Sequence, residues 1–353
     1  MRIQQTANLR IKHIQPVDPP QQVFSELPIS AEAAALVATT RRQIQQILAG
    51  QDPRLLVVVG PCSIHDPAAA LEYGEKLAAL ARALSQDLLI VMRTYFEKPR
   101  TRTGWKGLIN DPDLNESFDI NKGIRLARKL LSDLNDLGMP TGTEFLDIVA
   151  GQYISDLVSW GAIGARTTES QVHREMASGL SCPVGFKNGT DGNLQIACDA
   201  IFAAAEPHIF LSPTDEGHMA IFTTTGNPDT HLILRGGRQP NYDSAEVDKT
   251  IRLLEQNRLR PRVMIDLSHA NSEKQYTRQL VVGDDIATQI RNGQTHIFGV
   301  MIESHLVAGR QDMHQGKPLC YGQSITDACL SLEQTQPLLY KLADAVQRRR
   351  AHT

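Results

Sequence analysis

Apolar and polar positions follow two different periods along most of this chain. Short apolar runs, β-branched where they are densest, recur from residue 54 onward, and a stretch with helical spacing follows each of them. The runs are RLLVVVG (54–60), LLIVMR (88–93), TGTEFLD (141–147), GAIGART (161–167), PVGFKNG (183–189), HLILRGG (231–237), RVMIDLSHA (262–270) and IFGVMIESH (297–305). This eightfold strand–helix alternation predicts an α/β fold, a (β/α)8 TIM barrel. A doubly wound open sheet is the alternative.

Two segments fall outside this alternation. HIFLS (208–212), the polar turn PTDEGH and MAIFTTTG predict an antiparallel hairpin inserted at about 208–226. Prolines at 16, 19, 20 and 28 argue against one long helix in the first thirty residues. Residues 30–50 have a helical pattern that Ser30 caps and Gly50 ends. We therefore divide the chain into an N-terminal arm and helix, 1–50, and a barrel that carries the hairpin, 51–353.

Composition narrows the classes of function. The chain has 353 residues, 41% hydrophobic and 21% charged, with a net charge of −3, which gives no reason to expect nucleic acid or an anionic membrane as partner. No apolar run approaches the ~18 residues of a membrane span, and the polar N-terminal stretch does not resemble a signal peptide. The five cysteines are scattered and odd in number. This usage favours free thiols in a reducing cytoplasm.

Positive charge gathers where the predicted strands end. A single Arg or Lys is most simply a surface or ion-paired residue. Several like charges at one barrel mouth repel one another unless an anion neutralises them, and their geometry suits phosphate and carboxylate. We therefore expect an anionic substrate that carries both groups. The residues are Arg93, Lys98, Arg100, Arg166, Lys187 and Arg235.

A second set of strand-end residues carries metal-ligand chemistry. One thiol, one imidazole and two carboxylates suit a borderline divalent ion such as Mn, Fe, Co or Zn. The spacing along the chain does not test this, because the residues follow separate strands. A buried structural Cys and a structural His are the simpler interpretations, and His65, His173 and His305 are rival ligands. The candidate ligands are Cys62, His269, Glu303 and Asp327.

Long motifs then connect the chain to a known family. GPCSIHD, MRTYFEKPRTRTGWKGLINDP, GARTTESQVHREMASGLSCPVGFKNGTDG, ILRGG, DLSHAN and YGQSITDAC together resemble the type I 3-deoxy-D-arabino-heptulosonate 7-phosphate (DAHP) synthases, from about residue 30 to residue 345. The resemblance implies condensation of phosphoenolpyruvate with D-erythrose 4-phosphate, the first step of the shikimate pathway. It also implies a metal held by the four candidate ligands above, and a homodimer or homotetramer in which the N-terminal arm makes contacts.

The same resemblance assigns roles to residues. Arg93, Lys98, Arg166, Lys187 and Arg235 would hold phosphoenolpyruvate, with Glu144 nearby. Erythrose 4-phosphate would contact Lys98, Arg100, Thr101 and Asp327, and Lys98 is the expected proton donor. An aromatic amino acid inhibitor would bind away from the metal, at Gly151, Gln152, Ser181, Phe210, Ser212 and Phe222. Ser212 counts against tyrosine, and Gly151 favours tryptophan over phenylalanine.

Three other functions remain open at this stage. One is the sister synthase that uses arabinose 5-phosphate, although KPRT (98–101) and the long arm favour the heptulosonate enzyme. Another is a phosphatase that uses the same metal and cations. The third is a metal- or metabolite-binding regulatory protein without activity, which the complete set of ligands argues against. A fused chorismate mutase is excluded, since only one helical pattern follows residue 330.

Overall fold

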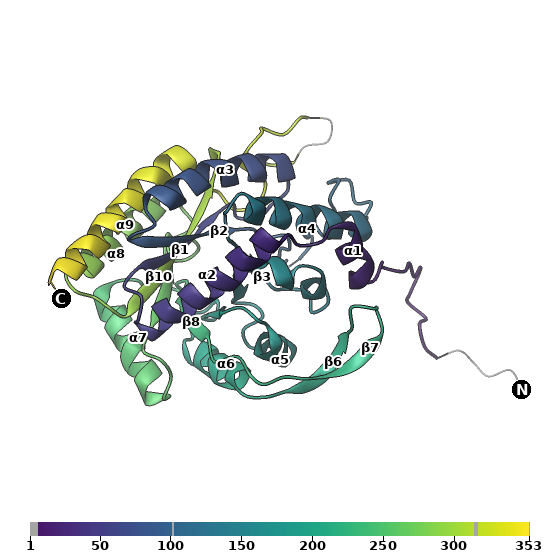
Figure 1. Ribbon diagram of the computed structural model, residues 1–353, viewed down its shortest axis with the longest axis horizontal. Helices are drawn as coiled ribbons and strands as arrows, with labels where there is room; N and C mark the ends of the chain where they lie inside the picture. Colours follow the sequence, from purple (N-terminus) through teal and green to yellow (C-terminus); the bar gives the residue numbers. More distant parts are fainter. Residues whose placement is uncertain (1–5, 101, 314–316, 353) are drawn as a thin grey trace, which may run out of the picture.

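Eight parallel strands form a closed barrel in the computed structural model, which describes residues 6–100, 102–313 and 317–352 (Figure 1). Closure is explicit, because Val57 pairs with Ile90 on one side and with Val300 on the other. This confirms the predicted barrel and excludes the open sheet. The barrel strands are β1 (Leu55–Gly60), β2 (Leu88–Arg93), β3 (Thr141–Glu144), β4 (Trp160–Ile163), β5 (Val184–Lys187), β8 (Thr230–Leu234), β9 (Val263–Asp266) and β10 (Ile297–His305).

Side chains of the strands pack on both faces of the barrel wall. In β1, Leu55, Val57 and Val59 pack into the cluster that includes the surrounding helices, whereas Leu56 and Val58 belong to a separate interior cluster. Successive residues of a strand point to opposite faces, so a wall that is buried on both sides must be apolar throughout. The unbroken run LLVVVG is therefore the sequence signature of a barrel strand.

Helices surround the barrel, with one exception. They are α3 (Pro67–Ala83), α4 (Ile120–Asp136), α5 (Gln171–Gly179), α6 (Gln195–Ala205), α7 (Ser244–Gln256), α8 (Arg278–Arg291) and α9 (Leu332–His352). After β3 the chain forms only two 3-10 segments, η1 (Ala150–Tyr153) and η2 (Ser155–Leu157), where the sequence pattern predicts an α-helix. The β-branched Ile148 and Val149 and the following Gly151 have low helix propensity. The connection to β4 is also short.

Two helices precede the barrel, and the second packs against its interior. They are α1 (Pro20–Glu26) and α2 (Ala31–Ala49), and α2 crosses in front of the strands in Figure 1. The Oγ of Ser30 accepts a hydrogen bond from the Ala33 amide at 3.0 Å, and Gly50 ends the helix with φ 75°. Both predicted helix ends are thus confirmed. Ile44, Ile47 and Leu48 pack into the interior cluster of the barrel.

The predicted hairpin is present between α6 and β8. Its strands are β6 (Ile209–Pro213) and β7 (Met219–Thr223), paired antiparallel with Phe210 opposite Phe222. It extends from the barrel alongside α5 and α6 (Figure 1). One face exposes Ile209, Leu211, Met219 and Ile221. Its tip contacts the start of α1, since the Gln21 amide donates to the Asp215 carbonyl at 2.8 Å.

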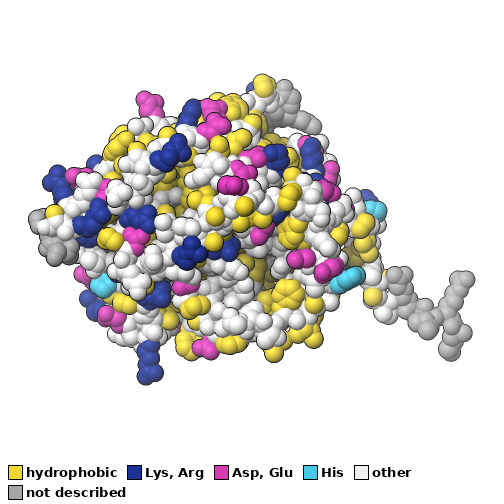
Figure 2. Space-filling view, in the orientation of Figure 1, with side chains coloured by type: hydrophobic (Ala, Val, Ile, Leu, Met, Phe, Trp, Pro, Cys, Tyr) yellow, Lys and Arg dark blue, Asp and Glu magenta, His cyan; other side chains and the backbone are white. Residues whose placement is uncertain are grey.

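The segment after β10 forms short strands beside the barrel mouth. They are β11 (Val307–Arg310), β12 (Gln323–Ser324) and β13 (Leu330–Ser331), and β13 pairs with the end of β10. Charges of both signs are interspersed on the face shown in Figure 2. Among the described helices, none is long and apolar enough to cross a membrane.

Candidate active site and metal centre

Most of the predicted strand-end residues line one pocket. Its volume is about 150 Å³, and it lies where the barrel strands end. Cys62 and Glu303, which are fully buried, contact residues of this pocket. Thr101 was also predicted here and lies outside the described residues. The predicted residues that line the pocket are Arg93, Lys98, Arg100, Glu144, Arg166, Lys187, Arg235, His269 and Asp327.

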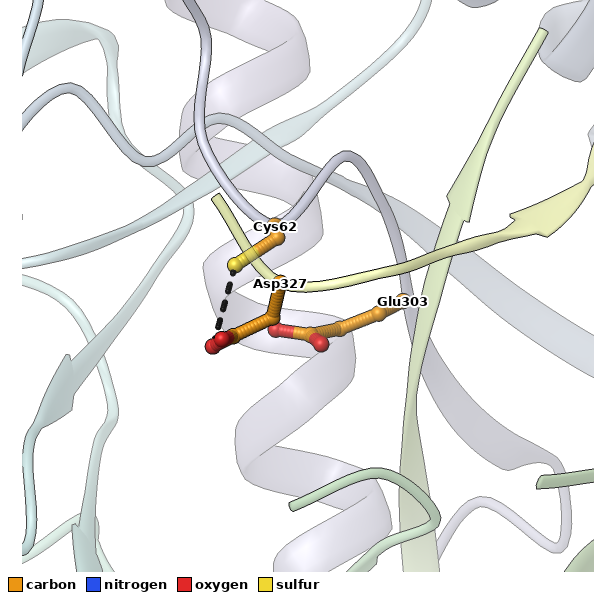
Figure 3. Close-up of side chains that lie close together, drawn as sticks. All are labelled: Cys62, Glu303 and Asp327. Atoms are coloured by element: carbon orange, nitrogen blue, oxygen red, sulfur yellow. Dashed lines mark hydrogen bonds between the residues drawn. The ribbon is translucent and has the colours of Figure 1, made fainter. Parts of the chain in front are cut away.

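Three of the four candidate metal ligands converge on one point (Figure 3). One ligand atom from each of Cys62, Glu303 and Asp327 lies within 4.8 Å of the others. The Sγ of Cys62 is 3.6 Å from Oδ2 of Asp327. Burial, reinforced by the Glu303 carboxylate, raises the pKa of the Cys62 thiol to about 11. A cation at this point would reverse that preference, because a coordinated thiol is deprotonated.

His269 stands next to this cluster. Its Nε2 is 3.9 Å from Oε1 of Glu303, while its Nδ1 lies 2.8 Å from Oδ2 of Asp266. One sulfur, two carboxylates and an imidazole form a donor set that fits Mn, Fe, Co or Zn. The residues therefore fit the implied metal, with His269 beside the three that converge.

Hydrogen bonds orient the Glu303 carboxylate. The Oγ of Ser268 donates to Oε2 of Glu303 at 2.8 Å. The Gln279 side chain holds the Glu303 backbone from both sides, donating to its carbonyl at 3.1 Å and accepting from its amide at 2.9 Å. Such outer contacts fix the geometry of a metal ligand.

Asp266 was not singled out from the sequence, yet it is central to this site. It is fully buried, and its Oδ2 lies 2.9 Å from Nζ of Lys187 as well as 2.8 Å from His269. Burial alone would raise the pKa of Asp266, but His269 and Lys187 hold it well below its usual range. Asp266 and Ser268 belong to the quoted segments around DLSHAN, whereas nothing in the sequence marked Gln279.

The guanidinium of Arg93 interacts with buried groups of the protein. Its Nη2 is 3.2 Å from Oε1 of Glu303, its Nε donates to the Pro61 carbonyl at 3.0 Å, and its guanidinium lies 3.4 Å above the ring of Tyr95. Only 1% of its surface is exposed. Arg93 thus balances the charge of Glu303 at the wall of the pocket.

Replacing Arg93 should therefore destabilise the fold. We expect Arg93→Met to lower the free energy of unfolding by about 3–5 kcal/mol, because it leaves the Glu303 carboxylate buried without its partner. Urea denaturation measures the change. The control is Lys76→Met, which breaks an exposed pair with Glu72 and should cost less than about 1 kcal/mol. Equal losses for the two variants would contradict the role of Arg93.

The other cations leave charge facing the pocket. The Nζ of Lys98 lies 3.1 Å from Sγ of Cys62, and Nε of Arg100 donates to the Trp105 carbonyl at 2.8 Å. Burial lowers the pKa of Arg235; Asp266 opposes this shift, and the neighbouring Arg166 adds to it. Two guanidinium groups held this close favour a bound anion.

Gly107 fixes the loop that carries Lys98. It adopts φ 116°, and an added Cβ would overlap the carbonyl oxygen of Phe96. The Lys98 amide donates to the Lys106 carbonyl at 2.9 Å beside it. We expect Gly107→Ala to lower the free energy of unfolding by more than about 1 kcal/mol and to reduce turnover, since Lys98 must move. Thermal unfolding and an activity assay check both effects. Gly138→Ala is the control, because it has φ 79° and open space around it; a turnover loss of the same size there would contradict this explanation.

Comparisons with known proteins identify the family of this chain. The family described as the DAHP synthetase I family matches residues 26–340. The chain belongs to the DAHP synthetase I family. It is therefore an enzyme of the DAHP synthase type.

Relatives cover nearly the whole DAHP synthetase chain. It is 58% identical to the Phe-sensitive phospho-2-dehydro-3-deoxyheptonate aldolase of Escherichia coli (strain K12), over 98% of this chain and 99% of that protein. It is 56% identical to the Trp-sensitive aldolase of Salmonella typhimurium (strain LT2), over the same shares. A solved aldolase structure from Francisella tularensis SCHU S4 is similar with a TM-score of 0.94 and 53% identity, covering 96% of this chain and 99% of that one.

The described part of the chain also has a second, larger cavity. Its volume is about 860 Å³, and η1, α5 and the hairpin contribute its walls. Inside it, Nε2 of Gln152 donates to Oγ of Ser212 at 3.1 Å, and the rings of Phe210 and Phe222 lie 6.2 Å apart. All six residues predicted for an inhibitor line this cavity: Gly151, Gln152, Ser181, Phe210, Ser212 and Phe222.

Proposed function

We propose that this chain condenses phosphoenolpyruvate with D-erythrose 4-phosphate to give DAHP and phosphate, the first step of the shikimate pathway to the aromatic amino acids. One observation carries the proposal: six cationic side chains line the pocket beside the Cys62, Glu303 and Asp327 cluster. Two phosphates and a carboxylate need such a concentration of positive charge. The aldehyde needs a Lewis acid to polarise it, and this cluster can hold a metal ion that does so.

We propose that one divalent ion, Mn, Fe, Co or Zn, is held by Cys62, His269, Glu303 and Asp327. Such an ion supplies Lewis-acid polarisation of the aldehyde. The chain keeps the ligand oxygens of Glu303 in place through Ser268 and Arg93.

Positioning is the main task of the cations. Lys187, Arg166 and Arg235, with Arg93 beneath them, hold phosphoenolpyruvate next to Glu144. Arg100 holds the sugar phosphate, with Lys98 and Asp327 at its aldehyde end; Thr101, also expected to contact it, lies outside the described residues. Bringing two anions that repel each other into contact lowers the barrier mainly through orientation.

Lys98 serves as the proton donor. The alkene carbon of phosphoenolpyruvate bonds to the aldehyde carbon, and the aldehyde oxygen takes a proton from Nζ of Lys98 to become a hydroxyl. Water adds to the adjacent carbon, where positive charge develops, and loses one proton, which restores the Lys98 ammonium. The resulting phosphate hemiketal then releases inorganic phosphate and leaves the keto group of DAHP.

The loss of phosphoenolpyruvate absorbance in the ultraviolet tests the function. We expect loss only when erythrose 4-phosphate and manganese are both present, and none with a chelator. Consumption without the sugar would instead indicate a phosphatase. Activity with arabinose 5-phosphate alone would indicate the sister synthase, and no reaction with either sugar would indicate a binding protein.

We also propose an aromatic amino acid inhibitor in the 860 Å³ cavity. The paired rings of Phe210 and Phe222 offer an apolar wall, and Gln152 and Ser212 offer polar groups for an amino acid. Gly151 adds no side chain, which favours the bulky indole of tryptophan over phenylalanine, with tyrosine least favoured.

Separate titrations check the choice of inhibitor. We expect tryptophan to inhibit at the lowest concentration. Ser212→Gly, which removes the partner of Gln152, should shift the preference toward tyrosine, whose hydroxyl needs the vacated space. The control is Ser25→Gly, on the exposed surface of α1. Inhibition by phenylalanine at a lower concentration than tryptophan would reverse the proposed preference.

We propose a homodimer or homotetramer in which the arm and the hairpin make the contacts. Both expose apolar side chains, including Leu9 and Ile14 in the arm and Leu211 and Ile221 in the hairpin. A cytoplasmic location would keep Cys62 reduced, in agreement with the five free cysteines.

A further inference from the structure

One carboxylate oxygen lies between the two halves of the candidate site. The Oδ2 of Asp266 is 2.8 Å from Nδ1 of His269 and 2.9 Å from Nζ of Lys187. Its other oxygen, Oδ1, accepts a hydrogen bond from the Ser268 amide at 3.0 Å, which fixes the orientation of the carboxylate. Asp266 is fully buried and Lys187 is 3% exposed, so water does not mediate between them.

We propose that Asp266 is a positioning residue that couples metal binding to phosphoenolpyruvate binding, because His269 and Lys187 share this one oxygen. The inference rests on the proposed function, since it takes His269 as a metal ligand and Lys187 as a contact of the anionic substrate. It assigns a role to a residue that itself touches neither ligand.

The histidine side of the coupling follows from imidazole chemistry. Nδ1 lies 2.8 Å from a carboxylate oxygen of Asp266, which favours the proton on Nδ1 and leaves the lone pair of Nε2 on the side of Glu303. His269 adopts φ 55°, a strained backbone conformation for a residue other than glycine. When Nε2 gives its lone pair to a cation, Nδ1–H becomes a stronger donor. Oδ2 then interacts more strongly with His269.

The lysine side follows from charge sharing. Without a cation on His269, Oδ2 is a strong partner for the Lys187 ammonium and holds it away from an incoming anion. When Oδ2 interacts more strongly with His269, less of its negative charge is left to hold the Lys187 ammonium. Lys187 then interacts more strongly with the phosphate or carboxylate in the pocket. Coupling between two binding equilibria is reciprocal, and phosphoenolpyruvate must therefore also tighten metal binding.

A purely structural role for Asp266 predicts different results. If Asp266 only neutralised Lys187 and supported the pocket, its removal would disorder the site and weaken phosphoenolpyruvate binding in all conditions. Shared-oxygen coupling instead predicts that removal strengthens phosphoenolpyruvate binding to the metal-free protein, because Lys187 loses its competing partner.

Calorimetric titration of phosphoenolpyruvate into the full-length chain tests the inference, with chelated and with manganese-loaded protein. In the wild type, manganese should tighten phosphoenolpyruvate binding by about 5-fold or more, the usual lower range of coupled sites. In Asp266→Asn, metal-free protein should bind phosphoenolpyruvate more tightly than metal-free wild type, and manganese should change that affinity less than 2-fold. Manganese affinity itself should fall by about 10–100-fold.

Two control variants show whether the loss of a negative charge, or weaker manganese binding, is enough by itself to abolish the coupling. Glu144→Gln also removes a negative charge from the pocket but leaves the Lys187–Asp266–His269 chain intact, so the effect of manganese should persist. Ser268→Ala removes the hydrogen bond to Glu303 and should weaken manganese binding, again with coupling retained at saturating manganese. If Asp266→Asn does not fold by circular dichroism, the smaller Asp266→Ser replaces it.

The outcomes are distinct. Wild-type coupling that survives in the Asp266 variant, or weaker metal-free binding in that variant, overturns the inference. A wild type that binds phosphoenolpyruvate equally with and without manganese also overturns it while leaving the proposed reaction standing. A wild type that neither binds nor consumes phosphoenolpyruvate overturns the proposed function itself.

Discussion

Cys62→Ser should lower manganese affinity by more than about 100-fold and reduce phosphoenolpyruvate consumption to background, with the fold retained. The loss of an outer hydrogen bond alone costs a metal site about 10–100-fold, and Cys62 supplies a ligand atom directly. A serine hydroxyl is shorter and does not ionise near neutral pH, so it does not replace the thiolate. Metal titration and the ultraviolet assay measure the two effects.

Another buried cysteine provides the matched control. Cys198 in α6 is 1% exposed and lies among the helices around the barrel. Cys198→Ser should change stability modestly and leave manganese affinity unchanged. Wild-type manganese affinity in Cys62→Ser would show that the ion, if any, binds elsewhere.

Lys98→Arg should reduce kcat by about 10²–10⁴-fold, the usual contribution of a general acid. Arginine keeps the positive charge that attracts both substrates, but its guanidinium does not release a proton near neutral pH. KM for phosphoenolpyruvate should therefore change much less than kcat. The Nζ of Lys98 is 3.1 Å from Sγ of Cys62, which keeps the ammonium beside the metal ligands. Steady-state kinetics separates the two parameters.

The neighbouring Lys106 offers a control from the same loop. Its side chain is exposed, and its backbone carbonyl accepts from the Lys98 amide. Lys106→Arg keeps that backbone contact and should leave kcat unchanged. Full turnover in Lys98→Arg would assign the proton transfer to another group.

The barrel was predictable because the composition of each strand segment alone shows that the strand is buried on both faces. LLVVVG is apolar throughout and LLIVMR is apolar up to its terminal arginine, and only strands covered on both faces need this composition. The hairpin was predictable from its polar turn between two strand-like runs. Parallel strands that close into a barrel also bring their C-terminal ends together, which is why residues as far apart in sequence as Arg93 and His269 could be placed in one pocket.

Other features were not predictable from single segments. The connection from β3 to β4 had a helical pattern, but Asp147 accepts from the Val149 and Ala150 amides and initiates a 3-10 turn instead. Gln279 reaches Glu303 from α8, a contact that depends on how that helix packs on β10. Asp266 was read as part of an apolar strand, since nothing local shows that its neighbours in space are Lys187 and His269.

Closure of the barrel has a consequence for how the chain is made. The free edge of β1 and the apolar side of α2 appear early in synthesis, but their partner β10 emerges about 240 residues later. At the usual 5–20 residues per second, the ribosome leaves that edge unpaired for on the order of ten seconds or more. An unpaired apolar edge is a template for pairing with other chains. Nascent chains of this protein are therefore expected to need protection from aggregation until the last barrel strand has left the exit tunnel.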